Sequence, residues 1–142
     1  MKPEFREFEH TADRGLELAA TSLAGLFRAA LAGLFFLYTG RPLPESPGEA
    51  TPFRIRLAAG NAEELLVKTL NEAIFRTERA GHPFRPVELR LRKRPAGGLS
   101  LTLGLTNVII FPIIAEIKSA THHQLKIEKE RGVWRCRVIF DV

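Results

Sequence analysis

The chain has 142 residues and a mass of 15.9 kDa, the size of one compact domain spanning residues 1–142. An apolar fraction of 45% and a charged fraction of 26% exclude an intrinsically disordered chain. The net charge of +5 favours acidic partners, and the single cysteine, Cys136, excludes a disulfide framework or a multi-cysteine zinc cage.

No segment has the pattern of a targeting signal or a membrane span. The first fifteen residues are charged throughout, unlike a secretory signal. The most apolar stretch, 23–38, carries Arg28 and is short for a bilayer span, so we expect a buried core helix there. With the low cysteine content, these features favour a cytoplasmic protein without membrane contact.

The first 40 residues predict a hairpin followed by a helix. Residues alternate between polar and apolar at 5–10 and 15–18, which is typical of two short strands, with a turn at 11–14 between them. Apolar residues then recur at helical spacing from Leu23 to Leu34, after a capping serine or threonine. Gly40 is expected to end this helix, which is apolar on nearly all sides and should lie deep.

The middle of the chain predicts a connection, a strand and a second helix. Four prolines make residues 41–52 an irregular surface segment. Residues 53–59 alternate as a strand with one buried face. Asn61 is the expected N-cap of the next helix, with Glu64 as its capping-box partner and Gly81 at its end.

The following residues predict a hairpin and then a segment without a clear assignment. Alternation at 87–92 and 99–105, around a proline–glycine turn, indicates two paired strands with one apolar face. Residues 108–117 form a continuous apolar run, but Pro112 makes a central strand unfavourable there.

The C-terminal residues predict two more strands, at 125–128 and 133–142, joined by a turn at 129–132. The complete order is strands, helix, strand, helix and then several strands. This order predicts an α+β two-layer sandwich, with two main helices on one face of a largely antiparallel sheet of about six strands.

The chain contains no recognisable catalytic motif. Two acidic residues nevertheless stand out: Asp13 in the predicted turn, and Asp141, the penultimate residue of the sequence. If they lie together near the final residue, their like charges require a cation or a basic side chain, and the oxygen atoms would suit Ca²⁺ or Mg²⁺. Alternatively, Asp13 caps a turn and Asp141 is solvated. His10 is a candidate hydrogen-bond partner for Asp13.

Other chemically active residues have ordinary explanations. His122 and His123 are adjacent, so on a strand they would point to opposite faces rather than share a metal. Cys136 is expected to be a buried, inert thiol. Two basic clusters could contact phosphate or form the solvated face of a sheet. They comprise Arg85, Arg90, Arg92, Lys93 and Arg94, and Lys126, Lys129, Arg131, Arg135 and Arg137.

Four segments resemble the archease family in order and spacing. They read FEHTADRGLEL near the beginning, ELLVKTLNEAIF in the second predicted helix, EIKSATHHQLKIE, and WRCRVIFDV at the end. The HTAD run and the final RVIFDV are the most specific of these. The matches span essentially the whole chain, which is therefore similar to archeases along its length.

The resemblance implies a protein that is not an enzyme. Archeases are accessory proteins of the RtcB-type RNA ligase, which joins RNA ends bearing 2′,3′-cyclic phosphate or 3′-phosphate to 5′-hydroxyl ends. They promote GTP-dependent guanylylation of the ligase and its multiple turnover, in tRNA splicing and RNA repair. The implied partner is thus the ligase, with tRNA or other RNA met indirectly through it.

The resemblance also implies a metal site at Asp13, Asp141 and Val142, the last contributing main-chain or terminal oxygens. His10 and Lys118 are its expected supporting residues. Calcium is the favoured divalent ion, with magnesium, manganese and zinc as alternatives.

Two departures from the family pattern limit this carry-over. The tyrosine of the family segment IKAVTYH is replaced by His122, and residues 106–114 are apolar where relatives carry charges.

These residues lead to a mechanistic hypothesis. The two aspartates would hold or hand over a divalent ion, or engage the ligase's own metal site, and so help align GTP phosphates, metal and histidine. The main alternative is a basic RNA-binding or tRNA chaperone module that uses the basic clusters. A stand-alone enzyme is a more distant third.

Overall fold

The computed structural model describes residues 1–10, 13–45 and 52–142. Within these ranges the chain forms two helices and eight strands. The helices are α1 (Leu23–Thr39) and α2 (Ala62–Ala80). The strands are β1 (Glu4–His10), β2 (Asp13–Ala20), β3 (Phe53–Ala59), β4 (Phe84–Lys93), β5 (Leu99–Asn107), β6 (Ser119–Ala120), β7 (Glu128–Glu130) and β8 (Val133–Asp141).

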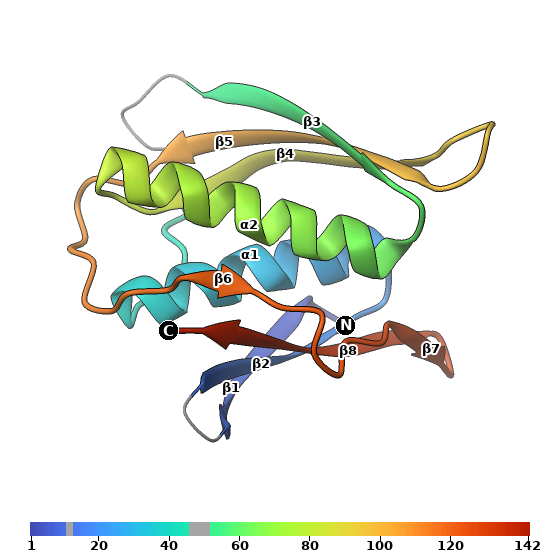
Figure 1. The fold of residues 1–142 in the computed structure, drawn as a ribbon, viewed down its shortest axis with the longest axis horizontal. Coiled ribbons are helices and arrows are strands. Elements are labelled where there is room, and N and C mark those ends of the chain that lie inside the picture. Colours follow the sequence, from blue (N-terminus) through green and yellow to red (C-terminus); the bar gives the residue numbers. More distant parts are fainter. Residues whose placement is uncertain (11–12, 46–51) are drawn as a thin grey trace.

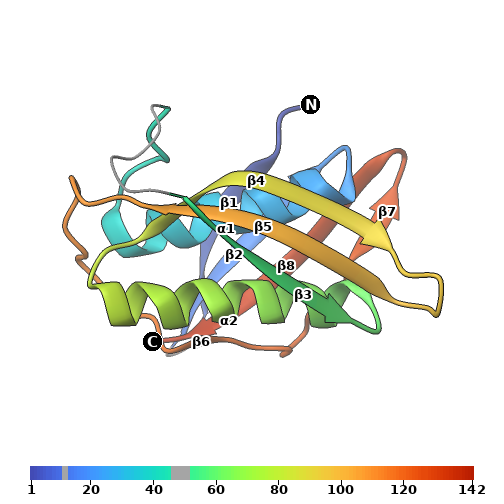
Figure 2. The same cartoon turned by 90° about the horizontal axis from the view of Figure 1, so that it is seen from above.

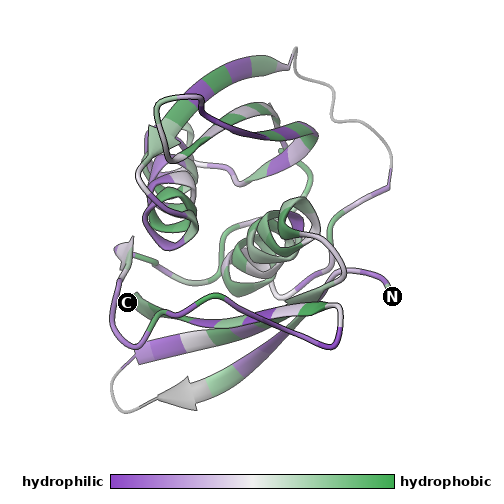
Figure 3. Cartoon of the chain, turned by 90° about the vertical axis from the view of Figure 1, so that its right-hand side faces the viewer, coloured by the Kyte–Doolittle hydropathy of each residue, from purple (hydrophilic) through white to green (hydrophobic). Residues whose placement is uncertain are grey.

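The helices lie between two antiparallel sheets (Figure 1). The lower sheet of Figure 1 has the order β1-β2-β8-β6, and β7 also pairs with β8. The upper sheet has the order β3-β5-β4 and covers the helices when seen from above (Figure 2). Viewed end-on in Figure 3, both helices lie in the space between the two sheets.

The predicted α+β class, with two helices and antiparallel strands, is confirmed. The strands, however, divide between two sheets instead of forming one sheet of about six. The reason is the composition of α1, which is apolar around most of its circumference and buried along most of its length. Such a helix needs apolar cover on both sides, and α1 contacts β2 of one sheet and β4 of the other.

Both helices begin and end at the predicted capping residues. The Ser22 hydroxyl accepts a hydrogen bond from the Gly25 amide at 2.9 Å, and Asn61 Oδ1 accepts one from the Glu64 amide at 2.8 Å. One detail differs from the predicted capping box. The Glu64 carboxylate accepts from the Gly60 amide, one residue before the N-cap, at 3.2 Å.

Several strand boundaries differ from the prediction. Asp13 lies in β2, where it pairs with His10, and not in a turn. β7 contains only Glu128–Glu130. Val87 was expected on the buried face of β4, but it is exposed because the register shifts between Pro86 and Glu88.

The apolar run at 108–117 forms neither helix nor strand, consistent with Pro112. It is held by main-chain hydrogen bonds at two points, from the Val108 amide to the Pro83 carbonyl and from the Ile114 amide to the Tyr38 carbonyl, each 2.8 Å long. Among the described helices, none combines the length and apolar character needed to cross a membrane.

Candidate functional site

The antiparallel pairing of β2 with β8 places the two candidate aspartates at the same end of neighbouring strands. Arg14 is the first residue of β2 with a partner in β8, and that partner is Phe140. Continuing this register by one residue sets Asp13 opposite Asp141. Opposed residues on antiparallel strands have Cα atoms about 4.5–5.5 Å apart. The beginning and the end of the chain therefore meet in one corner of the lower sheet.

Both aspartates belong to the outward face of this sheet. Opposed residues share a face, and successive residues alternate between faces. Leu16 and Val138 are opposed, have no exposed surface, and so mark the face that packs on the helices. Asp13 and Asp141 lie an odd number of residues from them and point to the other side. Asp13 is half-buried and Asp141 is exposed.

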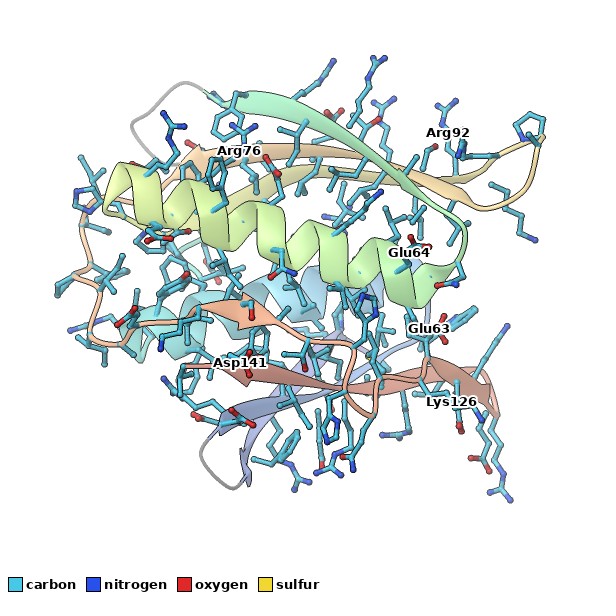
Figure 4. The ribbon with its side chains drawn as sticks, in the orientation of Figure 1. Glu63, Glu64, Arg76, Arg92, Lys126 and Asp141 are labelled. Atoms are coloured by element: carbon cyan, nitrogen blue, oxygen red, sulfur yellow. The ribbon has the colours of Figure 1, made fainter. Side chains whose placement is uncertain are left out.

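The short strand β6 adds a hydroxyl and a main-chain contact to this corner. Ser119 is opposed to Asp141 in the ladder, and its hydroxyl lies 3.4 Å from Asp141 Oδ2. The Lys118 amide donates to the Asp141 carbonyl at 2.8 Å. The Lys118 side chain is exposed and lines a neighbouring hollow. Figure 4 shows Asp141 where β6 and β8 run side by side.

Two residues that the sequence patterns did not single out hold the strands of this corner. The Arg14 guanidinium donates to both carboxylate oxygens of Glu7, at 2.7 and 3.0 Å, and to the Leu37 carbonyl at 3.0 Å. Arg14 thereby ties the start of β2 to β1 and to the last turn of α1. The order of residues gives no sign of this contact, because Leu37 is 23 positions away.

Asn71 of α2 holds β6 from the other side. Its side-chain amide donates to the Ala120 carbonyl at 3.2 Å and accepts from the Ala120 amide at 2.7 Å. Both main-chain groups of this strand residue are thus satisfied by one side chain. A lone polar residue near the apolar stripe of the predicted helix was the only sequence signal for it.

The remaining predicted site residues are only partly described. Thr11 and Ala12 of the HTAD run lie outside the described residues, and so does the side chain of His10. Val142 follows Asp141 directly and is exposed. The described part of the chain contains no group of three His, Cys, Asp or Glu side chains arranged to hold a metal.

A hollow of about 570 Å³ lies next to this corner. It is formed by the last turns of α1 and α2 and by residues 113–118, and Lys118 belongs to both the hollow and the acidic corner. Tyr38 lines it. Burial raises the pKa of the Tyr38 phenol above its ordinary value, and the nearby Glu78 carboxylate adds to this rise. The phenol therefore stays protonated and polar without becoming a base.

Cys136 is buried, as predicted. Burial, with a smaller contribution from the Glu63 carboxylate, raises the pKa of its thiol to about 12. A thiol with this pKa is protonated at neutral pH and is a poor nucleophile. The prediction of an inert cysteine is consistent with this environment.

Comparison with known proteins identifies the family. Residues 5–142 match the Archease protein family (MTH1598/TM1083). The "Probable protein archease" of Mycobacterium tuberculosis is 31% identical over 139 residues, covering 96% of this chain and 74% of that protein. The "Protein archease" of Methanopyrus kandleri is 29% identical over 143 residues, covering 97% and 99%.

Solved structures agree with this match. The solution structure of protein 1598 of Methanobacterium thermoautotrophicum covers all of both chains, with 26% identity and a TM-score of 0.78. The crystal structure of an archease from Thermotoga maritima, described as a possible chaperone, covers 96% of both chains with a TM-score of 0.67. At 23% identity, the second structure supports the fold alone. The chain belongs to the archease family.

Proposed function

We propose that this protein is a non-catalytic activator of an RtcB-type RNA ligase, working in the cytoplasm, and that the corner formed by Asp13 and Asp141 acts on the ligase. Family membership supports the partner. The observation that carries the site is the register of β2 and β8, which sets the two aspartates opposite each other on an outward face.

The atoms in this corner fit a hard divalent cation. Two carboxylates on opposed strand positions repel each other, so a cation between them would stabilise both. Asp13 and Asp141 would hold the ion, with the Ser119 hydroxyl, main-chain oxygens at Val142 and water completing the oxygen set. Calcium accepts such mixed and flexible oxygen sets most readily, while magnesium, manganese and zinc are alternatives. A bound cation would supply positive charge for phosphate oxygens.

The chain's own contribution is to keep these oxygens in place. Arg14 fixes the beginning of β2, and Asn71 fixes β6 beside Asp141. Groups that are already positioned need not reorganise when charge develops nearby, which is the basis of electrostatic stabilisation. An accessory protein with such a corner can favour the ligase state in which GTP phosphates, metal and histidine are aligned.

An exposed apolar segment beside the corner offers a contact surface for the ligase. Ile110 and Ile114 have 65% and 68% of their surface exposed, and Ile109 is also largely exposed. The same chain segment continues through Lys118 to the main-chain contact with Asp141. A partner seated on these isoleucines would therefore lie against the aspartates. The same surface would serve a chaperone, the role suggested for the Thermotoga maritima relative.

Ligase guanylylation with GTP tests the proposal. Asp13→Asn and Asp141→Asn keep the side-chain size but remove the charge, and each should reduce stimulation of the guanylylation rate at least about tenfold, the size of effect expected for one lost electrostatic contact. Glu130→Gln, an exposed acid on β7, is the matched control and should stimulate as the wild type does. Wild-type stimulation by both folded aspartate variants would refute the assigned role of this corner.

Binding measurements separate the corner from the contact surface. Ile110→Asp with Ile114→Asp should weaken ligase binding, whereas Asp13→Asn and Asp141→Asn should keep it. Calorimetric titration of calcium into the free protein should show binding to the wild type and its loss in the aspartate variants. A wild type that prevents ligase aggregation without changing the guanylylation rate would support the chaperone role instead.

A further inference from the structure

The upper sheet has four arginines on its outward face. Arg54 and Arg56 come from β3, and Arg90 and Arg92 from β4, on either side of the central strand β5. We call these four residues the arginine face. The register aligns Arg56 and Arg90 with the same β5 residue, Thr102. Guanidinium groups therefore line both sides of the central strand.

Small residues of β5 make this face a shallow trough. Ser100, Thr102 and Gly104 point outward between the arginines, and a hollow of about 350 Å³ lies over the first two. Among the described residues, neither the Ser100 nor the Thr102 hydroxyl has a hydrogen-bond partner. The trough thus combines guanidinium walls with a floor of available hydroxyl groups.

The positive charge of the face is only partly neutralised. Glu88 is the one acidic residue lining the hollow within the described chain, and it is shared. Its carboxylate lies 2.7 Å from Arg54 Nε and 3.3 Å from Arg90 Nε. Arg56 and Arg92 form no ion pair with any described residue. Like charges side by side on a sheet are destabilising, so the free protein keeps this arrangement at a cost in stability.

We infer that the arginine face binds the phosphate backbone of structured RNA. Guanidinium forks match phosphate oxygens in a bidentate geometry, and serine and threonine hydroxyls donate to them as well. The absence of aromatic residues among those lining the trough argues against stacking of single-stranded bases. Apart from Leu101, its lining residues are polar, which argues against the apolar centre of a protein interface.

The dimensions of the face suit an extended polyanion better than one phosphate. β3 and β4 are separated by two strand spacings, about 10 Å, and Arg90 and Arg92 are about 7 Å apart along β4. Lys93 and Arg94 continue the positive charge beyond Arg92 toward the hairpin turn. Several backbone phosphates can therefore be contacted at once, without reading sequence.

This site is separate from the acidic corner. Arg92 and Asp141 lie on opposite sides of the helix layer in Figure 4. An RNA on the arginine face would leave the corner open to the ligase. The inference therefore stands on its own observations and does not depend on the proposed ligase activation.

The test is fluorescence anisotropy with a labelled 20-base-pair RNA duplex over a range of salt concentrations. Replacing Arg56, Arg90 and Arg92 by glutamine should weaken binding at least about tenfold and reduce the slope of log affinity against log salt by about two. The matched control replaces Arg6, Arg135 and Arg137 on the lower sheet, removing the same charge, and should change affinity less than about twofold.

Several outcomes would overturn the inference. Equal losses in the two triple variants would indicate diffuse attraction by net charge. Competition by millimolar inorganic phosphate, or by polyglutamate at matched charge, would indicate a single-anion site or an acidic protein partner. A wild type that does not bind the duplex at 150 mM salt, a concentration at which backbone contacts still hold, would also exclude it. If the triple variant does not fold, the single change Arg92→Gln should still weaken binding severalfold.

Discussion

The two sheets bury the same kind of surface and expose opposite kinds. Facing the helices, Leu16 and Val138 of the lower sheet and Leu103 of the upper sheet are completely buried. On the outward side of the lower sheet, Glu17 pairs with Arg6 and Arg137, and the strands end at two aspartates. The outward side of the upper sheet carries arginines without enough acidic partners.

This difference shows where the fold leaves freedom for function. Both inner faces must be apolar to cover helices that are buried between them. The outer faces are not needed for this core, so their charges can diverge. A net charge of +5 conceals the division, because the acidic corner and the arginine face contribute to it with opposite signs.

The glycines in the two sheets allow the comparison to be broken on one side only. Gly15 of β2 lies under the Phe8 ring, and an added Cβ would come within 2.2 Å of that ring. The ring also stacks on the Arg137 guanidinium at 4.0 Å. Gly15→Ala should therefore lower the free energy of unfolding by about 2–3 kcal/mol, as overpacking does. Urea denaturation measures this.

Gly104 of β5 is the matched control in the upper sheet. A Cβ there would meet the Glu88 Cβ at 3.1 Å, a contact that a small movement relieves. Gly104→Ala should change stability by less than about 1 kcal/mol. Combining Gly15→Ala with Phe8→Ala should remove most of the added cost. Equal losses for the two glycine variants would show that Phe8 does not make the lower sheet special.

Much of the fold was predictable because its signals are local. The helices begin at residues such as Asn61, whose side chain bonds the main chain three positions later, and end at glycines such as Gly40, where the backbone φ is 69°. Alternation located most strands for the same reason. The division into two sheets was missed, because it depends on which strands α1 contacts from its two sides and not on any one segment.

The candidate site was predictable in its acids but not in its supports. Asp13 and Asp141 stood out because they are polar residues at the ends of apolar strands. Arg14 and Asn71 act through partners 23 and 49 positions away, and such distances leave no periodic pattern in the sequence. The arginines of the upper sheet were visible as charges, but their alignment across β5 depends on strand register.

Two asparagines make a second comparison between the sheets. Asn71 bonds both main-chain groups of Ala120 in the lower sheet, and Asn107 of the upper sheet donates to the His82 and Pro83 carbonyls. Asn71→Ala leaves a buried amide unpaired, so it should lower the free energy of unfolding by about 2 kcal/mol. It should also weaken calcium binding, because β6 is then free to move away from Asp141.

Asn107→Ala tests whether that second effect is specific. It should lower stability by a similar or smaller amount, yet leave calcium affinity unchanged, since Asn107 does not touch β6. Thermal unfolding and calorimetric titration of both variants provide the two readouts. If both asparagine variants weaken calcium binding equally, general loosening of the fold explains the loss, and the assigned role of Asn71 is wrong.

The smallest expected effect comes from Cys136, on the inner face of the lower sheet. Its folded pKa is about 12 against an ordinary value of 9.0, because burial disfavours the thiolate. Above pH 9 the unfolded chain therefore releases a proton that the folded chain retains, and stability falls as pH rises toward 12. Between pH 8 and pH 10 this amounts to about 1 kcal/mol.

The difference between wild type and Cys136→Ala isolates this contribution, because all other groups titrate in both proteins. Tyr38, whose phenol also has a raised pKa, lowers the stability of both chains alike above pH 10. Urea denaturation at pH 8 and pH 10 should show the wild type losing more stability than the variant. Parallel losses would mean that the thiol ionises as easily in the folded chain as in the unfolded one, so that the inner face of the lower sheet is wetter than its packing indicates.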